Sequence, residues 1–289
     1  MKTKSVGEKG EGFELEVVGG ERRDGFALVV GADGTWSKTR SSYLDSVTKP
    51  EYSRVMGFNF SIPDAEVNAT EEWKLTNKGS VFAFGDGKQI VSQQLGDGSL
   101  HVSAWVTTEG EDQPALVTRT KEEILELCFE DWSEELISLI RKAGNESAES
   151  RLMFTLPGDY EWEHRKGVTL LGDSAHVMLP FAGEGVNLAF EDAMKLCDAI
   201  LQGETETLDQ RIKRFEEDMF YRAKRAQKMT RGMTKAMMFT PGAPRTGIES
   251  WILSKIEYEF PSVAKWGWPV AQAAVYGWFF AVKLFSGCA

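Results

Sequence analysis

The chain has 289 residues, with 42% hydrophobic and 27% charged residues, which is typical of a globular protein of one or two domains. Its formal net charge of −11 argues against a nucleic-acid partner, which requires a basic face. Three histidines and three widely spaced cysteines (Cys128, Cys197 and Cys288) give no metal-ligand spacing, and they indicate reduced thiols in a cytoplasmic compartment.

The N-terminal part of the chain predicts two strands followed by a turn. Residues 13–18 alternate between apolar and polar side chains, which indicates a strand with one buried face. Residues 26–30 are apolar throughout and predict a strand buried on both faces. The run that follows contains a tight turn at Asp33-Gly34, and Arg40 is placed to pair with Asp33 or with a phosphate.

The middle of the chain, residues 53–108, predicts an antiparallel sheet. Its candidate strands are 54–62, 79–84, 89–94 and 99–106. Gly-Asp-Gly turns at 85–87 and 96–98 provide hairpin connections. Some aromatic side chains here could line a pocket for a flat substrate, although most are expected to form the sheet core. These aromatic residues are Phe58, Phe60, Trp73, Phe82, Phe84 and Trp105.

Helices are predicted on either side of a further strand. Thr120 and Glu123 form a capping box before an apolar-periodic run, and Ser133 is placed to cap a second helix that Gly144 ends. The remaining elements are a strand at 152–156, a helix at 185–202 stopped by Gly203, and a long helix at 208–239. The apolar stripe of the long helix is Ile212, Phe215, Met219, Ala223, Ala226, Met229 and Met233.

The segment 168–187 has the most distinctive pattern in the chain. An apolar strand runs directly into a Gly-Asp turn, a second turn rich in proline and glycine follows, and a helix then begins. The glycines let a ligand approach the main chain closely, the aspartate lies at the carboxyl end of a strand, and the helix start offers unpaired N–H groups. The segment therefore predicts a site for a polar, partly anionic cofactor. Its candidate binding residues are Gly172, Asp173, Pro180, Gly183, Gly185, Val186 and Asn187.

The region after residue 247 is rich in aromatic residues. The stretch 269–282 is nearly all apolar, but it is shorter than the ~20 residues of a membrane-spanning helix. A packed C-terminal helix is the default expectation. Trp and Tyr residues flank the stretch as interfacial anchors do, which keeps open a weak peripheral association of this tail with a membrane or a partner.

Two of these segments resemble motifs of one family. The Gly172-Asp173 segment resembles the second FAD fingerprint of the FAD-dependent aromatic hydroxylases, single-component flavin monooxygenases that include tetracycline-inactivating and salicylate-hydroxylating enzymes. The run from Asp33 to Arg40 is similar to the Asp-Gly motif of the same family, and the two motifs occur in the family's order. The resemblance covers residues 13–238.

The resemblance implies an α/β fold that combines an incomplete Rossmann-like FAD-binding domain with an antiparallel substrate-binding sheet and C-terminal helices. The expected divisions are a partial FAD-binding segment (1–48), the substrate-binding sheet (49–112), a return to the FAD-binding domain (113–203) and a C-terminal helical region (204–289). Asp173 is expected to hold the ribityl chain of FAD. Asp33, Gly34 and Arg40 are expected to support the pyrophosphate region.

The function implied by the resemblance is hydroxylation or epoxidation of a small aromatic or polycyclic substrate. NAD(P)H reduces FAD, and the reduced flavin adds O₂ to form a C4a-hydroperoxide that delivers the oxygen. N–H groups at the helix start, from Gly185 to Asn187, would stabilise the anionic reduced flavin. Many family members have Gln where this chain has Glu184, so we expect its carboxylate to point outward or to be hydrogen-bonded. His176 is expected to pack the turn rather than to act as a base.

The family's first FAD motif, a Gly-x-Gly-x-x-Gly loop between a strand and a helix, is not found. Gly7, Gly10 and Gly12 have a different spacing and follow no apolar strand. One explanation is an incomplete gene model or fragment that starts at an internal methionine. The alternative is a truncated, non-catalytic flavin-fold remnant that acts as an interaction module. The local consistency of the later elements favours the first explanation.

Overall fold

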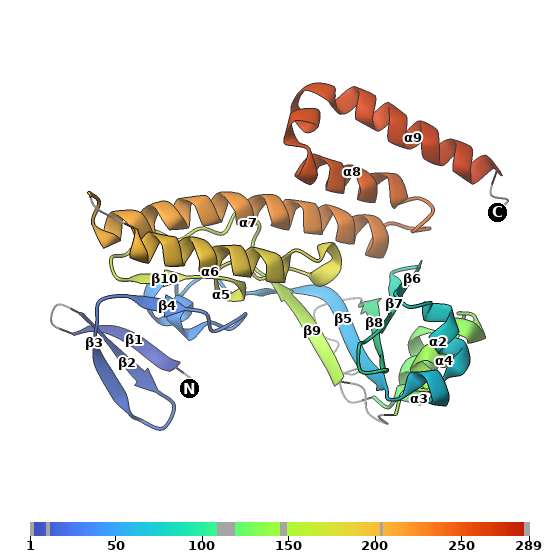
Figure 1. Ribbon diagram of the computed structural model, residues 1–289, viewed down its shortest axis with the longest axis horizontal. Helices are drawn as coiled ribbons and strands as arrows, with labels where there is room; N and C mark the ends of the chain where they lie inside the picture. Colours follow the sequence, from blue (N-terminus) through green and yellow to red (C-terminus); the bar gives the residue numbers. More distant parts are fainter. Residues whose placement is uncertain (1–2, 10–11, 109–118, 145–148, 203–204, 286–289) are drawn as a thin grey trace. The chain divides into compact units, whose positions relative to one another are not determined.

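The computed structural model describes residues 3–9, 12–108, 119–144, 149–202 and 205–285 of a mixed α/β chain (Figure 1). The chain divides into two compact units. Unit 1 contains residues 1–51, 154–232 and 254–264, and unit 2 contains residues 52–153, 233–253 and 265–289. The predicted α/β fold class is confirmed.

Unit 1 contains two small sheets. Strands β1 (Thr3–Lys9), β2 (Gly12–Val17) and β3 (Arg22–Phe26) form an antiparallel sheet. Strands β4 (Val29–Gly31) and β10 (Val168–Leu170) form a parallel pair in which Val29 is opposite Val168.

The single strand expected over residues 26–30 is divided between these two sheets, and this prediction was wrong. Phe26 pairs with Phe13 of β2, whereas Val29 pairs with β10. Gly25 has a φ of +83°, a left-handed conformation that bends the chain just before the two pairings diverge. Strand β1 lies in a polar segment for which the sequence predicted no strand. It pairs antiparallel with the next strand, β2.

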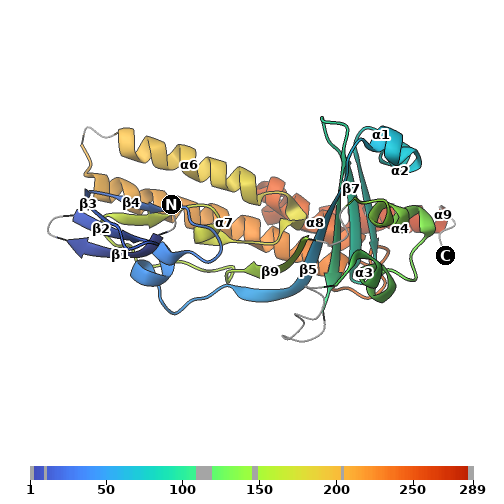
Figure 2. The ribbon, with the colours of Figure 1, turned by 90° about the horizontal axis from the view of Figure 1, so that it is seen from below.

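The helices of unit 1 pack on the parallel pair. After the four-residue helix α5 (Asp173–His176) come the short 3₁₀ turn η3 (Pro180–Ala182) and helix α6 (Gly185–Leu201). Helix α6 lies beside α7 (Leu208–Met238) in both views of the chain (Figures 1 and 2). Every residue of the apolar stripe predicted for the long helix is buried. Gly203, expected to stop α6, lies outside the described residues.

Unit 2 is built on a five-stranded sheet with the order β6-β7-β8-β5-β9. Its strands are β5 (Glu51–Ile62), β6 (Ser80–Gly85), β7 (Lys88–Gln94), β8 (Leu100–Thr107) and β9 (Glu149–Thr155). Four helices gather on one side of it (Figure 2): α1 (Ala65–Asn68), α2 (Thr70–Thr76), α3 (Lys121–Cys128) and α4 (Glu134–Arg141). The predicted antiparallel sheet and its two helices are confirmed.

The two faces of this sheet differ in character. Phe58 and Phe60 are buried in the core between the sheet and its helices, so they have the structural role expected of most aromatics here. Trp105 lies on the opposite face, since the side chains of β8 alternate in burial along the strand. Gly57 faces Trp105 across the β5–β8 pairing, and a Cβ at Gly57 would lie 2.5 Å from the indole ring. The second face thus makes room for a large aromatic ring.

Of the two side-chain caps predicted for α3 and α4, one is present. Thr120 and Glu123 form the complete capping box at α3. Ser133 stands at the N-cap of α4 but makes no capping hydrogen bond with its side chain, which the prediction had assumed. Its backbone carbonyl instead accepts the Ile137 N–H at 3.0 Å. The backbone hydrogen bond is therefore sufficient to begin this helix.

The C-terminal region forms α8 (Ile248–Glu259), a short π-helical turn η4 (Val263–Gly267) and α9 (Trp268–Phe285). Within the described ranges no helix is both long enough and apolar enough to cross a membrane. The expected helix is present, but it is not packed into a core: none of its described side chains is buried.

Gly31 controls how closely β4 approaches its surroundings. A Cβ at this position would lie 2.5 Å from Leu170 Cδ2 and 2.8 Å from Thr39 Cβ, both buried. We expect Gly31→Ala to lower the free energy of unfolding by about 2 kcal/mol, because overpacking forces neighbouring groups apart. Urea unfolding followed by circular dichroism measures the change. Gly7→Ala is the control, since no atom lies within 4 Å of its added Cβ. Equal stability of the two variants would contradict the packing account.

Candidate functional site

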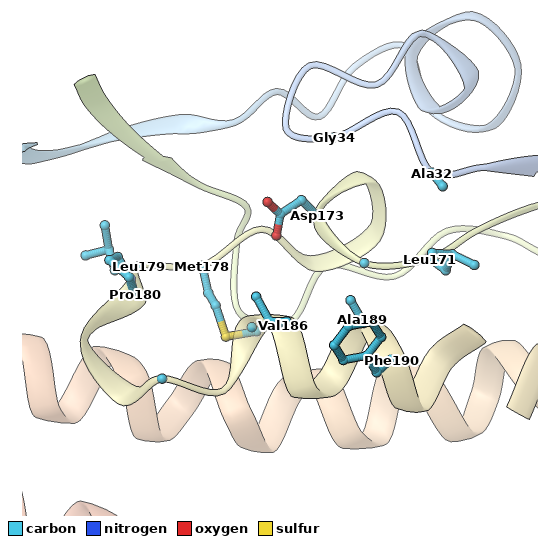
Figure 3. A pocket seen from close by; sticks show the side chains of 13 residues that line it. Ala32, Gly34, Leu171, Asp173, Met178, Leu179, Pro180, Val186, Ala189 and Phe190 are labelled. Atoms are coloured by element: carbon cyan, nitrogen blue, oxygen red, sulfur yellow. The ribbon is translucent and has the colours of Figure 1, made fainter. Parts of the chain in front are cut away.

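A cavity of about 600 Å³ opens in unit 1 at the carboxyl ends of β4 and β10 (Figure 3). Three segments line it: the turn after β4, the connection from β10 to α6, and the first turns of α6. The lining residues are Ala32, Gly34, Leu171, Gly172, Asp173, Met178, Leu179, Pro180, Gly183, Gly185, Val186, Ala189 and Phe190. The carboxyl ends of parallel strands are the usual position of ligand sites in α/β folds.

Glycines give the cavity a wall of bare main chain. Gly34, Gly172 and Gly183 have positive φ values of 78°, 61° and 69°, a conformation that side chains rarely allow. A Cβ added to Gly34, Gly183 or Gly185 would meet no atom within 4 Å, so these positions border open space. A bound group could therefore contact the main chain directly.

Asp173 supplies the carboxylate of this cavity. It is the first residue of α5, and its side chain is exposed. Figure 3 shows its oxygens between the turn at Gly34 and the first turn of α6, which carries Val186. An exposed carboxylate in this position can accept hydrogen bonds from the hydroxyl groups of a ligand.

The start of α6 presents unpaired hydrogen-bond donors. The first intrahelical bond joins the Leu188 N–H to the Glu184 carbonyl at 2.9 Å, so the N–H groups of residues 185–187 precede the ladder. The helix dipole gives this end a partial positive charge that favours anionic groups. Asn187 itself is not among the lining residues, whereas Gly185 and Val186 are.

Asp33 holds the turn after β4 rather than lining the cavity. Its carboxylate accepts the Ser37 hydroxyl at 2.5 Å and the backbone N–H groups of Lys38 and Thr39 at 2.7 and 3.1 Å. These bonds fix the loop that places Gly34 at the cavity. Direct contact of Asp33 with a cofactor stays a prediction.

Arg40 is buried and connects the two predicted motifs. Its guanidinium donates to the Ser174 carbonyl at 2.6 Å and to the Thr35 carbonyl at 2.7 Å. Burial lowers its pKa from the ordinary value, although Tyr160 and Asp33 oppose that effect. The Ser174 hydroxyl in turn donates to the Gly31 carbonyl at 2.5 Å. Arg40 does not line the cavity; in this structure it ties the Asp33 turn to the Asp173 turn.

Asp192 is a functional candidate that the sequence analysis missed. It lies on α6 with 0% of its surface exposed, directly behind the Gly172-Asp173 turn. Its Oδ2 accepts the Gly172 N–H at 3.0 Å and is hydrogen-bonded with His176 Nε2 at 2.6 Å. Its Oδ1 accepts Arg222 Nη1 from α7 at 2.9 Å. One carboxylate thus joins the turn, α6 and α7.

These contacts keep Asp192 ionised despite its burial. Burial alone would raise its pKa, but hydrogen bonds with His176 and from the Gly172 N–H outweigh it, so the pKa lies below the ordinary value. His176 is itself buried and packs the turn, as predicted. A signal for Asp192 was present in the sequence: it lies four residues from both Leu188 and Leu196, in the middle of the apolar face of α6.

Glu184 is kept away from the cavity by an ion pair. Its Oε1 accepts Lys255 Nζ of α8 at 3.0 Å, and Glu184 is not among the lining residues. The expectation that this carboxylate is hydrogen-bonded is confirmed. The negative charge beside the start of α6 is thereby partly neutralised.

The family of the chain follows from a comparison with known protein families. A family model described as FAD binding domain matches residues 20–232, which include the cavity and both predicted motifs. The chain belongs to this FAD-binding family, that of the FAD-dependent aromatic hydroxylases. No cluster of three metal-ligating side chains occurs among the residues described.

Known proteins are similar to this chain either in sequence or in fold. Monooxygenase penA of Penicillium thymicola is 28% identical over 252 residues, which cover 71% of this chain and 58% of penA. The structure of Klebsiella pneumoniae HpxO complexed with FAD and uric acid has a TM-score of 0.68 at 17% identity, covering 89% of this chain and 62% of HpxO. A salicylate hydroxylase substrate complex has a TM-score of 0.69 at 18% identity, covering 94% and 69%. The chain thus spans about three-fifths of penA.

The Asp192 network generates a prediction for stability. We expect Asp192→Asn to lower the free energy of unfolding by about 3 kcal/mol at neutral pH, because Arg222 then loses its buried anionic partner. Because folding lowers the pKa of Asp192 below its ordinary 3.8, this contribution is full above that pH and is lost as the pH falls through the folded-state pKa. Urea unfolding of both proteins from pH 7 to pH 3 measures the difference. The matched control is Asp198→Asn, an exposed carboxylate on the same helix. A loss that is independent of pH would contradict the assignment.

Proposed function

We propose that the chain is the flavin-facing part of an FAD-dependent monooxygenase that uses NAD(P)H and O₂ to hydroxylate or epoxidise a small aromatic or polycyclic substrate. The observation that carries the proposal is the cavity itself: Asp173 and the start of α6 flank glycine main chain at the carboxyl ends of β4 and β10. Membership of the FAD-binding family supports the cofactor. Because the chain covers 58% of penA, the activity of the whole protein is part of the proposal.

The residues at the cavity fit FAD. The Asp173 carboxylate would accept hydrogen bonds from the ribityl hydroxyls, and Gly34 would let the diphosphate approach the main chain. Asp33 and Arg40 would act on the cofactor mainly by holding these two turns. The wall formed by Pro180, Gly183 and the apolar side chains of α6 would lie against the flavin ring.

When bound, FAD would supply the redox chemistry, taking electrons from NAD(P)H and passing them to O₂. The chain's own part is to bind, orient and stabilise charge. N–H groups of residues 185–187 would stabilise negative charge on the reduced ring. Lys255 would support this effect by holding the Glu184 carboxylate at 3.0 Å.

The face of the unit 2 sheet that carries Trp105 is proposed to contact the substrate. Trp105 and Phe84 lie half-buried on this face, where a flat apolar molecule could stack on them. Gln89, paired with both in the sheet register, is buried, and its Oε1 accepts no hydrogen bond from any described part of the chain.

Titration of the purified 289-residue chain with FAD tests the cofactor proposal. We expect quenching of flavin fluorescence on binding, and about tenfold or greater weakening in Asp173→Ala, since hydrogen bonds to a charged group contribute about 1.5–3 kcal/mol. Asp198→Asn serves as a control for loss of a negative charge. Anaerobic addition of NADH or NADPH to the loaded chain then tests flavin reduction.

The outcomes separate the proposed enzyme from its rival. Binding that is equal in Asp173→Ala and wild type would contradict the placement of the flavin. No FAD binding by the wild-type chain would favour a non-catalytic flavin-fold module, the second interpretation of the sequence. Binding without reduction by either nicotinamide would contradict the proposed use of NAD(P)H by this chain.

Lys255 provides a second test. We expect Lys255→Met to lower the reduction potential of bound flavin by roughly 10–30 mV, because an unpaired Glu184 carboxylate disfavours the anionic reduced ring, and 30 mV corresponds to a tenfold change for two electrons. Potentiometric titration measures the shift. Glu184→Gln added to Lys255→Met should restore the potential, and Glu259→Gln, which removes the other carboxylate that contacts Lys255, is the control. An unrestored double variant would show that Lys255 acts by another route.

A further inference from the structure

Helix α9 exposes its apolar side chains and keeps its polar side chains less exposed, the opposite of what is expected for a helix in water. At about 100° per residue, its exposed positions lie on an arc of about two-thirds of the circumference, interrupted only by the partly exposed Ala271 and Ala281. The large apolar side chains on this arc are Val270, Tyr276, Trp278, Phe280, Val282 and Leu284. The arc carries no charged residue, and its only polar side-chain groups are the Tyr276 hydroxyl and the Trp278 indole N–H.

The polar side chains of α9 lie on the opposite arc. Gln272 and Lys283 are both only partly exposed, among Trp268, Val275 and Phe279. Lys283 forms an ion pair with Glu249 of α8, whose side chain is 8% exposed. A surface helix of a globular protein places its apolar stripe inward and its charges outward, so this arrangement indicates that the outer arc faces an apolar phase.

Composition and charge indicate which apolar phase this is. Trp and Tyr, whose rings are apolar with one polar group, are enriched where membrane and water meet. Residues 260–289 contain no acidic residue and two lysines, of which Lys283 is paired with Glu249, although the whole chain has a net charge of −11. Lys265 lies next to the 80% exposed Trp266, with its Nζ 5.0 Å from the ring centroid, just before α9 begins. A basic and aromatic end of this kind complements anionic lipid headgroups.

We propose that the outer arc of α9 is a membrane-docking surface that lies in the interface of a lipid bilayer. Val270 and Leu284, near the middle of the arc, would enter the acyl region, with Trp278 and Phe280 as anchors on its two sides. Lys265 and Trp266 would lie at headgroup level. No described helix meets the length and hydropathy needed for a span, so α9 would lie along the surface. This docking would hold the protein at the phase in which apolar polycyclic molecules accumulate, and it is independent of flavin binding.

Flotation of the full chain with lipid vesicles tests the proposal. We expect the wild-type chain to float with vesicles of phosphatidylcholine containing phosphatidylserine, and Trp278→Ser/Phe280→Ser to partition at least about tenfold less, since two interfacial aromatic anchors are lost. These side chains are 68% and 65% exposed. The matched control is Val67→Ser/Leu127→Ser, two apolar residues of the same unit that are 81% and 62% exposed. Lys265→Gln should reduce binding only to the vesicles that contain phosphatidylserine.

Each contrary result overturns the proposal. Absence of the wild-type chain from the floating fraction with both lipid compositions excludes membrane docking. Equal flotation of the Trp278→Ser/Phe280→Ser variant assigns any docking to another surface. A lipid-free dimer that becomes monomeric in this variant, measured by light scattering, would show that a second copy of the chain covers the arc instead. Circular dichroism of each variant establishes that the fold is retained.

Discussion

The cavity depends on one buried carboxylate. Asp192 lies behind the Gly172-Asp173 turn and binds the turn, His176 and Arg222 at the same time. An unpaired buried charge would cost several kcal/mol, so the three elements keep their relative positions as long as Asp192 stays ionised. The exposed Asp173 carboxylate can therefore be directed into the cavity from a four-residue helix that could not hold it alone.

The site is made mostly of main chain and apolar surface. Apart from Asp173, no lining residue has a polar side chain, so the other polar groups at the cavity belong to the main chain. Such a wall suits a cofactor that carries its own reactive chemistry, because the protein needs only to bind, orient and stabilise charge. In the sheet of the other unit, the same device appears once more, since Gly57 makes room for the large ring of Trp105.

Helix α9 obeys a different constraint from the helices of unit 1. The long helix α7 buries its apolar stripe, and Met219 and Ala226 are fully enclosed. In α9 the apolar arc is exposed, and Lys283, on the less exposed side, forms an ion pair with Glu249. The apolar arc of α9 is therefore a surface that folding leaves exposed. This is the reason for the proposed contact with a bilayer.

Local sequence determined much of this protein. The alternation of the middle strands, the capping box at Thr120, the stripe of α7 and the glycine turns at the cavity follow from period and backbone preference within a few residues. Only the tertiary structure decided the rest. It divided residues 22–31 between two sheets, enclosed Arg40 between carbonyl groups and buried Asp192 with its three partners. Several of these contacts join distant residues, such as Arg40 with Ser174 at 134 positions and Asp192 with Arg222 at 30, and no local pattern records which distant groups will meet.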